Sequence, residues 1–202
     1  MRRPSFLKRI RRDEGGATLV EFAFVAPVVL LMLIGGMDVG YSIYIRSVAN
    51  GALESVARSG SLEGATESQI RFDIRRNVKT ILPNFAANDA NIVVTTKNYT
   101  DYSRINAAEK IVVDNDSDGV LDVGDCWIDE DGNNQFGTNE GKDGIGGADD
   151  SVYYNVAITV PNLFPVNGLL GLPATRTINV KTLVVNQPYG QQATRPTVCR
   201  TV

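Results

Sequence analysis

The sequence predicts an α+β fold: a long N-terminal transmembrane helix that continues into an amphipathic helix, then a second helix, and a small antiparallel sheet with an acidic insertion. Three observations predict it. Residues 17–37 are almost all apolar, apolar residues then recur every three or four positions as far as Ile81, and runs rich in β-branched residues follow Asn91. The 202 residues, 43% of them hydrophobic, suffice for one modest domain beyond a membrane segment.

The apolar run Ala17–Met37 is long enough to cross a bilayer, because its 21 residues at about 1.5 Å each cover a hydrocarbon core of about 30 Å. Six basic residues precede it, and the positive-inside rule keeps them in the cytoplasm: Arg2, Arg3, Lys8, Arg9, Arg11 and Arg12. We therefore expect a basic leader (residues 1–16), a transmembrane helix (residues 17–37) and an exported domain (residues 38–202).

The exported domain begins with helical sequence. Apolar residues at helical spacing predict that the first helix continues to Gly60. Thr66 followed by Gln69 resembles a capping box and starts a second helix, which Pro83 ends.

Strand-forming sequence follows the second helix. Four β-branched runs predict strands of one antiparallel sheet packed against the helices, and they begin at Asn91, Lys110, Ser151 and Thr177. Between the last two lies PNLFPVNGLLGLP, an apolar loop with three prolines.

Glu21 is the anomaly of the apolar run, since an ionisable side chain at the centre of a bilayer costs about 2.5–3.5 kcal/mol. Gly16 followed by ATLVEF resembles a prepilin peptidase site, with Glu21 as the fifth residue of the mature chain. The basic leader and the sequence APVVLLMLIGGMDVGYSIYIRSVANGALESVARSG are similar to the TadE-like minor pilins and pseudopilins of the tight-adherence (Tad, Flp type IVb) pilus system.

This resemblance implies cleavage after Gly16. The new amine of Ala17 would then be neutralised by Glu21 of its own or a neighbouring subunit; alternatively, Glu21 reaches the cytoplasmic headgroups. The implied protein supports pilus biogenesis and surface adhesion from the inner membrane, with its C-terminal domain in the periplasm or on the pilus. The implied partners are the prepilin peptidase, the major pilin, other minor pilins and pilus platform proteins.

The acidic insertion, residues 114–150, holds twelve carboxylates and one lysine. Its segment DNDSDGVLDVGD has the spacing of an EF-hand calcium loop, in which alternate oxygens converge on one cation and a glycine allows the sharp turn. The predicted ligands of this first acidic loop are Asp114, Asp116, Asp118, the Val120 carbonyl, Asp122 and Asp125.

A second acidic loop, DEDGNNQFGTNE, repeats the pattern, with Asn134 where glycine is usual. Its predicted calcium ligands are Asp129, Asp131, Asn133, the Gln135 carbonyl and Glu140. The loops start only fifteen residues apart, so complete EF-hand helices do not fit between them. Asp143, Asp149 and Asp150 are accessory at best. The alternative is a solvated acidic linker whose charges repel one another.

Two cysteines, Cys126 and Cys199, are the whole cysteine content. Export favours a disulfide between them, which would fasten the insertion to the C-terminal tail, whereas two buried thiols are the alternative. Histidine is absent, so the commonest general base is missing and we do not expect an enzyme. We also expect no nucleic-acid partner. A membrane-tethered calcium-dependent adhesion or recognition module that never enters a pilus is the alternative function.

Overall fold

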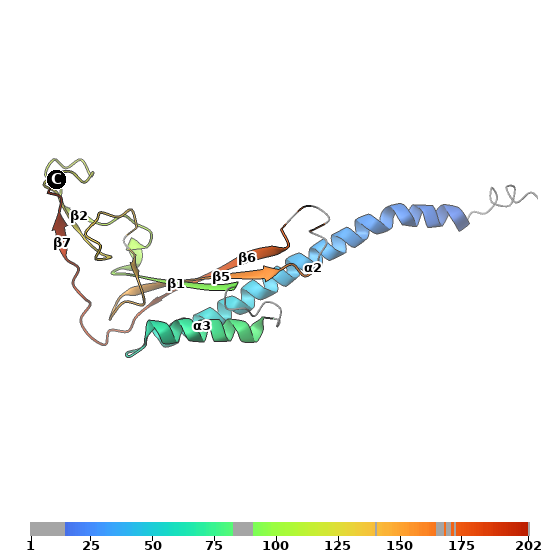
Figure 1. Ribbon diagram of the computed structural model, residues 1–202, viewed down its shortest axis with the longest axis horizontal. Coiled ribbons are helices and arrows are strands. Elements are labelled where there is room, and N and C mark those ends of the chain that lie inside the picture. The colour runs from blue at the N-terminus through green and yellow to red at the C-terminus, as the bar shows by residue number, and fades with distance from the viewer. Residues whose placement is uncertain are drawn as a thin grey trace, which may run out of the picture. The chain divides into compact units, whose positions relative to one another are not determined.

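The computed structural model describes residues 15–82, 91–139, 141–164, 168, 171 and 173–201 (Figure 1). The predicted leader, apart from its last two residues, and Glu140 lie outside this part of the chain. The elements are α2 (Gly15–Gly60), α3 (Glu67–Ile81), β1 (Ile92–Tyr99), η2 (Tyr102–Arg104), β2 (Ile111–Val113), β3 (Cys126–Ile128), β4 (Lys142–Asp143), β5 (Ser151–Pro161), β6 (Thr175–Val185) and β7 (Thr197–Cys199). The chain divides into two compact units, residues 1–43 with 162–174, and residues 44–161 with 175–202.

Helix α2 confirms the predicted long N-terminal helix, with Pro27 inside it. Its most apolar stretch has a mean hydropathy of 2.3 and none of it is buried, so α2 can cross a membrane by length and composition. One such helix near the N-terminus suggests a single-pass membrane protein. Within this unit, the Leu163 N–H donates to Asp38 Oδ1 at 2.8 Å, which ties the loop between β5 and β6 to the helix.

Helix α3 begins where the capping pattern predicts, because Thr66 Oγ1 accepts a hydrogen bond from the Gln69 N–H at 3.4 Å. Its apolar face is fully buried and consists of Ile70, Ile74 and Val78. The helix packs against β1. The predicted second helix is therefore confirmed.

The larger sheet has the order β4-β1-β5-β6, and all its pairings are antiparallel. Strand β5 lies between β1 and β6 and alternates buried with half-buried residues, as a strand with one face on a core should. The core it shares with α3 and with α2 beyond Tyr44 includes Leu53, Ile74, Val94, Tyr154 and Val156.

The prediction of a single sheet is wrong in one respect: the strand predicted at Lys110, β2, belongs to a second sheet of order β2-β3-β7. It pairs with β3, and β3 pairs with β7 of the C-terminal tail. Strands β3, β4 and β7 were not predicted, because two or three residues are too few to show an alternating pattern. Their pairing depends on contacts between distant segments.

Candidate functional site

Gly16 and Ala17 lie in the first turn of α2, which begins at Gly15. The N–H groups of a helix's first turn have no acceptor within the helix, so this turn unwinds at little cost. Glu21 follows one turn later and is exposed, as are its neighbours Leu19 and Phe22. Within the described part of the chain, Glu21 has no ion pair. The structure thus places the predicted processing residues together at the start of one apolar helix.

The first acidic loop folds around Asp114. Its two carboxylate oxygens accept the N–H groups of Ser117 at 2.7 Å and Gly119 at 3.0 Å, and Asp118 Oδ1 accepts the Val120 N–H at 2.7 Å. Gly119 has a φ of 77°, the left-handed conformation for which glycine is needed at the sixth loop position. These bonds bring carboxylate oxygens of Asp114, Asp116 and Asp118 within 4.8 Å of one another.

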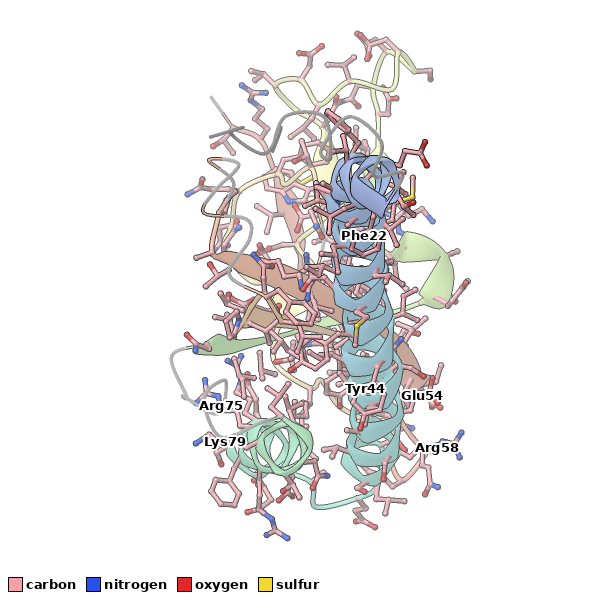
Figure 2. All side chains as sticks on the ribbon, turned by 90° about the vertical axis from the view of Figure 1, so that its right-hand side faces the viewer. Phe22, Tyr44, Glu54, Arg58, Arg75 and Lys79 are labelled. Carbon is pink, nitrogen blue, oxygen red and sulfur yellow. A yellow bond between two sulfur atoms is a disulfide. The ribbon has the colours of Figure 1, made fainter. Side chains whose placement is uncertain are left out.

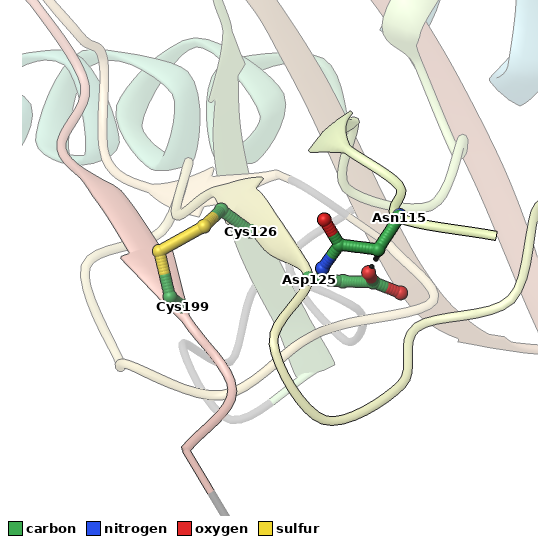
Figure 3. The surroundings of a disulfide bond; sticks show 4 residues. All are labelled: Asn115, Asp125, Cys126 and Cys199. Carbon is green, nitrogen blue, oxygen red and sulfur yellow. Dashed lines mark hydrogen bonds between the residues drawn. A yellow bond between two sulfur atoms is a disulfide. The ribbon is translucent and has the colours of Figure 1, made fainter. Parts of the chain in front are cut away.

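Asp125, the predicted last ligand of this loop, does not belong to the group formed by Asp114, Asp116 and Asp118. One of its oxygens accepts the Asn115 N–H at 3.0 Å (Figure 3). The other accepts the Asp122 N–H at 2.9 Å, and the residue is only 1% exposed. These backbone hydrogen bonds lower the pKa of the Asp125 carboxyl. Asp125 therefore closes the loop by binding its backbone, outside the group formed by Asp114, Asp116 and Asp118.

The second acidic loop repeats the backbone arrangement around Asp129. Asp129 Oδ1 accepts the Gly132 N–H at 2.9 Å, and its Oδ2 accepts the Asn134 N–H at 3.0 Å. Asn134 has a φ of 59°, as expected for the residue that replaces glycine at the sixth position. Asn133 Oδ1 accepts the Gln135 N–H, and Asp131 Oδ1 accepts the Asn133 N–H.

Glu109 joins the second loop although it precedes the acidic insertion, and the sequence reasoning missed it. One of its carboxylate oxygens lies within 4.8 Å of oxygens of Asp129 and Asp131. The side chain is 4% exposed, and its oxygens accept the N–H groups of Glu130 at 2.9 Å and Gly137 at 2.8 Å. A lone glutamate before a short strand carries no spacing signal, so the tertiary structure alone identifies it.

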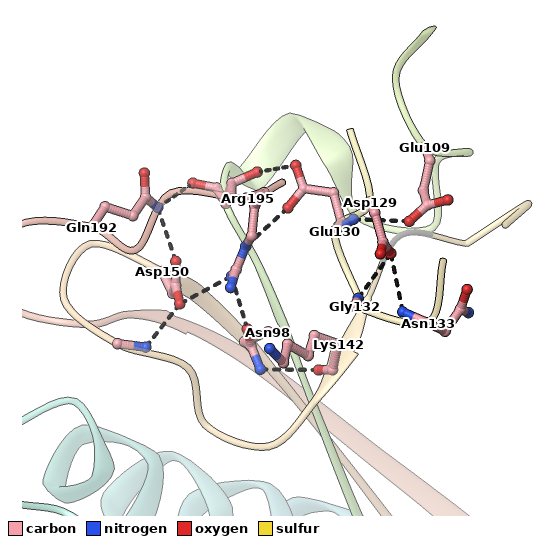
Figure 4. Close-up of polar contacts among 12 residues, drawn as sticks. Asn98, Glu109, Asp129, Glu130, Gly132, Asn133, Lys142, Asp150, Gln192 and Arg195 are labelled. Carbon is pink, nitrogen blue, oxygen red and sulfur yellow. Dashed lines mark hydrogen bonds and ion pairs between the residues drawn. The ribbon is translucent and has the colours of Figure 1, made fainter. Parts of the chain in front are cut away.

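Arg195 of the C-terminal tail holds two other carboxylates of the insertion (Figure 4). Its Nε donates to Glu130 Oε2 at 3.2 Å, and one terminal nitrogen lies 3.4 Å from Asp150 Oδ2 and 3.2 Å from Asn98 Oδ1. All three charged side chains are at most 10% exposed. Asp150, expected to be an accessory ligand at best, is therefore one anchor of the Arg195 cluster: Arg195, Glu130, Asp150 and Asn98.

Cys126 and Cys199 form a disulfide between β3 and β7, as predicted (Figure 3). The tail is further bound to the first acidic loop, since the Gly124 N–H donates to the Arg200 carbonyl and an Arg200 guanidinium nitrogen donates to the Leu121 carbonyl, both at 2.8 Å. Trp127 follows Cys126 directly in β3, is buried and meets Phe136 edge to face. The disulfide, the hydrogen bonds of Arg200 and the Trp127–Phe136 contact thus connect the C-terminal tail and the two acidic loops.

The first acidic loop fits a calcium ion by the chemistry of its donors. Calcium takes six to eight hard oxygen ligands, and this loop gathers three carboxylates around a glycine turn. Partial desolvation, together with repulsion from Asp118 and Asp114, raises the pKa of Asp116. The loop therefore carries clustered negative charge that a divalent cation would offset. In the second loop, Glu109, Asp129 and Asp131 supply a comparable set.

The N-terminal segment is similar to a known family. The family model described as TadE-like protein matches residues 16–58. This segment resembles the TadE-like family. The match agrees with the resemblance expected from the sequence, and it covers less than a quarter of the chain. No curated protein and no solved structure matches the chain. The matched segment lies within α2 and ends before α3, so the role of the sheets and acidic loops rests on their own geometry.

Proposed function

We propose that this protein is a minor pilin or pseudopilin of a Tad (Flp type IVb) pilus, cleaved by a prepilin peptidase between Gly16 and Ala17. The observation that carries the proposal is the TadE-like match over residues 16–58, which begins at the predicted cleavage site. The position of that bond in the first turn of α2 supports it, because the N–H groups of this turn have no acceptor within the helix and the turn can open to expose the bond at little cost.

After cleavage, the mature chain starts at Ala17 and keeps α2 as its membrane anchor. Glu21, one turn further on, is positioned to neutralise the new amine of its own or a neighbouring subunit. The domain after Asp38 lies on the periplasmic side of the inner membrane, where its disulfide forms. The major pilin, other minor pilins and the platform proteins are its partners, and adhesion follows from the assembled pilus.

Mass spectrometry of the membrane-extracted protein tests this proposal. A peptidase-positive host should yield a mature N-terminus at Ala17, and Gly16→Ala should leave the leader attached. Gly15→Ala is the matched control, because it changes the neighbouring glycine and leaves the predicted bond intact. An uncut wild-type chain in that host would exclude processing and favour the membrane-tethered recognition module that never enters a pilus.

Calcium binding is the second part of the proposal. Asp114, Asp116 and Asp118 would hold the ion in the first loop, and Glu109, Asp129 and Asp131 would hold it in the second, where it would offset their mutual repulsion. The largely exposed first loop suits the millimolar calcium of extracellular fluids. Calorimetry on the full chain in detergent should show calcium-dependent heat.

Asp116→Asn should weaken calcium binding by roughly tenfold, because it removes one charged ligand of the first loop. Asp101→Asn is the control, since Asp101 is an exposed acid that caps η2 outside both loops. Glu109→Gln should weaken only the second site. If millimolar calcium produces neither heat nor protection from proteolysis, the acidic linker becomes the correct interpretation.

A further inference from the structure

Four cations lie along α3 outside its buried face, and Arg71, Arg75, Arg76 and Lys79 are here called the α3 cationic stripe. Arg71, Arg75 and Lys79 are spaced four residues apart and are half-buried on one side of the helix, and Arg76 is exposed beside Arg75. Together with Ser68, Phe72 and Thr80 they line a surface groove of about 660 Å³. Figure 2 shows Arg75 and Lys79 on the side of α3 turned away from α2.

Only part of this charge is neutralised within the described chain. Arg71 pairs with Glu67 and also donates to the Val94 carbonyl at 3.0 Å, so it is a fixed part of the domain. Arg75 and Arg76 have no ion pair among the described residues, and the Arg75 Nε atom is buried without a hydrogen-bond acceptor there. The positive charges of Arg75 and Arg76 are therefore left without an anionic partner among the described residues.

Phe72 adds an apolar contact to the groove, since its ring is 59% exposed. A suitable partner therefore combines several anionic groups with a small apolar surface. The first acidic loop has both: Asp116, Asp118 and Asp122 are exposed, and Val120 and Val123 among them are 59% and 66% exposed.

We propose that the α3 cationic stripe of one subunit binds the first acidic loop of a second copy of this chain. Arg75 and Arg76 pair with the loop carboxylates, and Phe72 packs against the exposed valines. The contact joins two different surfaces of the chain, so each bound pair leaves one stripe and one loop free for further copies, as in a ring or a filament. This inference adds to the proposed function a subunit contact of the calcium-free loop, whose carboxylates a bound calcium ion would otherwise engage, and it does not depend on leader cleavage.

Charge reversal on the full chain in nonionic detergent tests the proposal, with EDTA present to keep calcium out of the loop. Variant A carries Arg75→Glu and Arg76→Glu, and variant B carries Asp116→Lys and Asp122→Lys. Variant B leaves intact the side chains of Asp114, Asp118 and Asp125, which hold the loop backbone. A carbodiimide should cross-link Lys79 of one copy to loop carboxylates of another. When isotope-labelled and unlabelled chains are mixed, cross-links that join a labelled to an unlabelled peptide identify links between copies.

Wild type should give these intermolecular links, and each variant alone should give roughly tenfold fewer, because like charges then face each other. Mixing A with B should restore association, detected by sedimentation, because the unaltered loop of A meets the unaltered stripe of B and the reversed stripe of A meets the reversed loop of B. A variant that has lost its fold cannot form either contact. Arg46→Glu with Arg58→Glu is the control for A, since both side chains are exposed on α2. Glu54→Lys with Glu63→Lys is the equivalent control for B.

Three results would overturn the proposal: no intermolecular links in wild type, unchanged association in both variants, or no recovery when A and B are mixed. If variant A instead loses only its binding to vesicles that contain phosphatidylglycerol, the stripe binds a membrane surface and the proposal is wrong. Thermal unfolding of every variant accompanies these measurements. Association should also fall steeply as salt rises from low to physiological concentration, because exposed ion pairs are screened.

Discussion

Two regions of the domain are stabilised in opposite ways. The helix–sheet region (residues 44–81, 92–99, 151–161 and 175–185) buries apolar side chains, among which Leu53 and Val156 are wholly inaccessible. The acidic region (residues 109–150 with the tail 195–200) buries acids instead, and Asp129 and Glu130 are 1% and 7% exposed. A disulfide, the Arg195 cluster and carboxylate-to-backbone hydrogen bonds stand in for an apolar core there.

This difference shows how a chain with too little apolar sequence for a second core can still order a large insertion. Short strands such as β3 and β7 bury little area, so they are stable only when other bonds hold them in register. Each buried carboxylate is satisfied by a backbone N–H or by Arg195, as buried charges require. The acidic region should therefore respond to loss of a charge or a crosslink, and the helix–sheet region to loss of volume.

The largest effect is expected from Arg195→Ala, which leaves Asp150 and Glu130 as buried, uncompensated charges. Removing one partner of a buried ion pair costs about 3–5 kcal/mol in the free energy of unfolding. Urea unfolding measures it. Arg200→Ala, in the same tail, is the control and should cost about 1 kcal/mol, because it removes one hydrogen bond to the Leu121 carbonyl. Equal effects of the two variants would contradict the assigned role of the Arg195 cluster.

Leu53→Ala tests the helix–sheet region. Truncating a fully buried leucine removes apolar contacts and leaves a cavity, at a cost of about 2–5 kcal/mol. Leu62→Ala, which truncates a leucine that is 48% exposed, should cost far less. Thermal unfolding followed by circular dichroism measures both. A small effect at Leu53 would mean that α2 contributes little to the core beyond the membrane.

Reducing the Cys126–Cys199 disulfide should destabilise the acidic region by about 2–4 kcal/mol, because the bridge closes a long loop of sequence separation 73. Hydrogen exchange should show faster exchange in β3 and β7, while β1 and β5 keep their protection. Cys126→Ser with Cys199→Ser gives the same comparison without reductant. Uniform loss of protection across both regions would show that the two regions unfold as one.

The smallest expected effect is a pH dependence confined to the first acidic loop. The folded-state pKa of Asp125 lies below its ordinary value of 3.8, so this carboxylate stabilises the folded loop above pH 3.8 and loses that contribution as the pH falls through the lowered pKa. Asp125→Asn should remove this dependence. The control is Asp101→Asn. The pKa of the Asp101 carboxyl is also lowered, mainly by its hydrogen bonds to Ser103, but Asp101 lies at η2, outside the first acidic loop. Amide exchange of Asn115 and Asp122 measures the local response.

Sequence patterns predicted the elements that are long or closely capped. The continuous α2, the Thr66 cap of α3 and the strands β1, β5 and β6 all carry a period or a capping signal in neighbouring residues. The turn residues at the sixth position of the two acidic loops were likewise predicted: Gly119 in the first loop, and Asn134 in the second, where glycine is usual. Both have positive φ. The TadE-like segment was recognised because its residues are contiguous.

The sequence by itself thus determined the long apolar N-terminal helix, the second helix, the long strands and the local fold of the acidic loops, because these depend on residues close in the chain. Only the tertiary structure decided that β2 leaves the main sheet, that Glu109 joins Asp129, and that Arg195 binds Glu130 and Asp150. Those contacts join segments up to 65 residues apart, as between Glu130 and Arg195, so no local pattern encodes them. Their energy depends on burial and geometry, which exist only once the chain has folded.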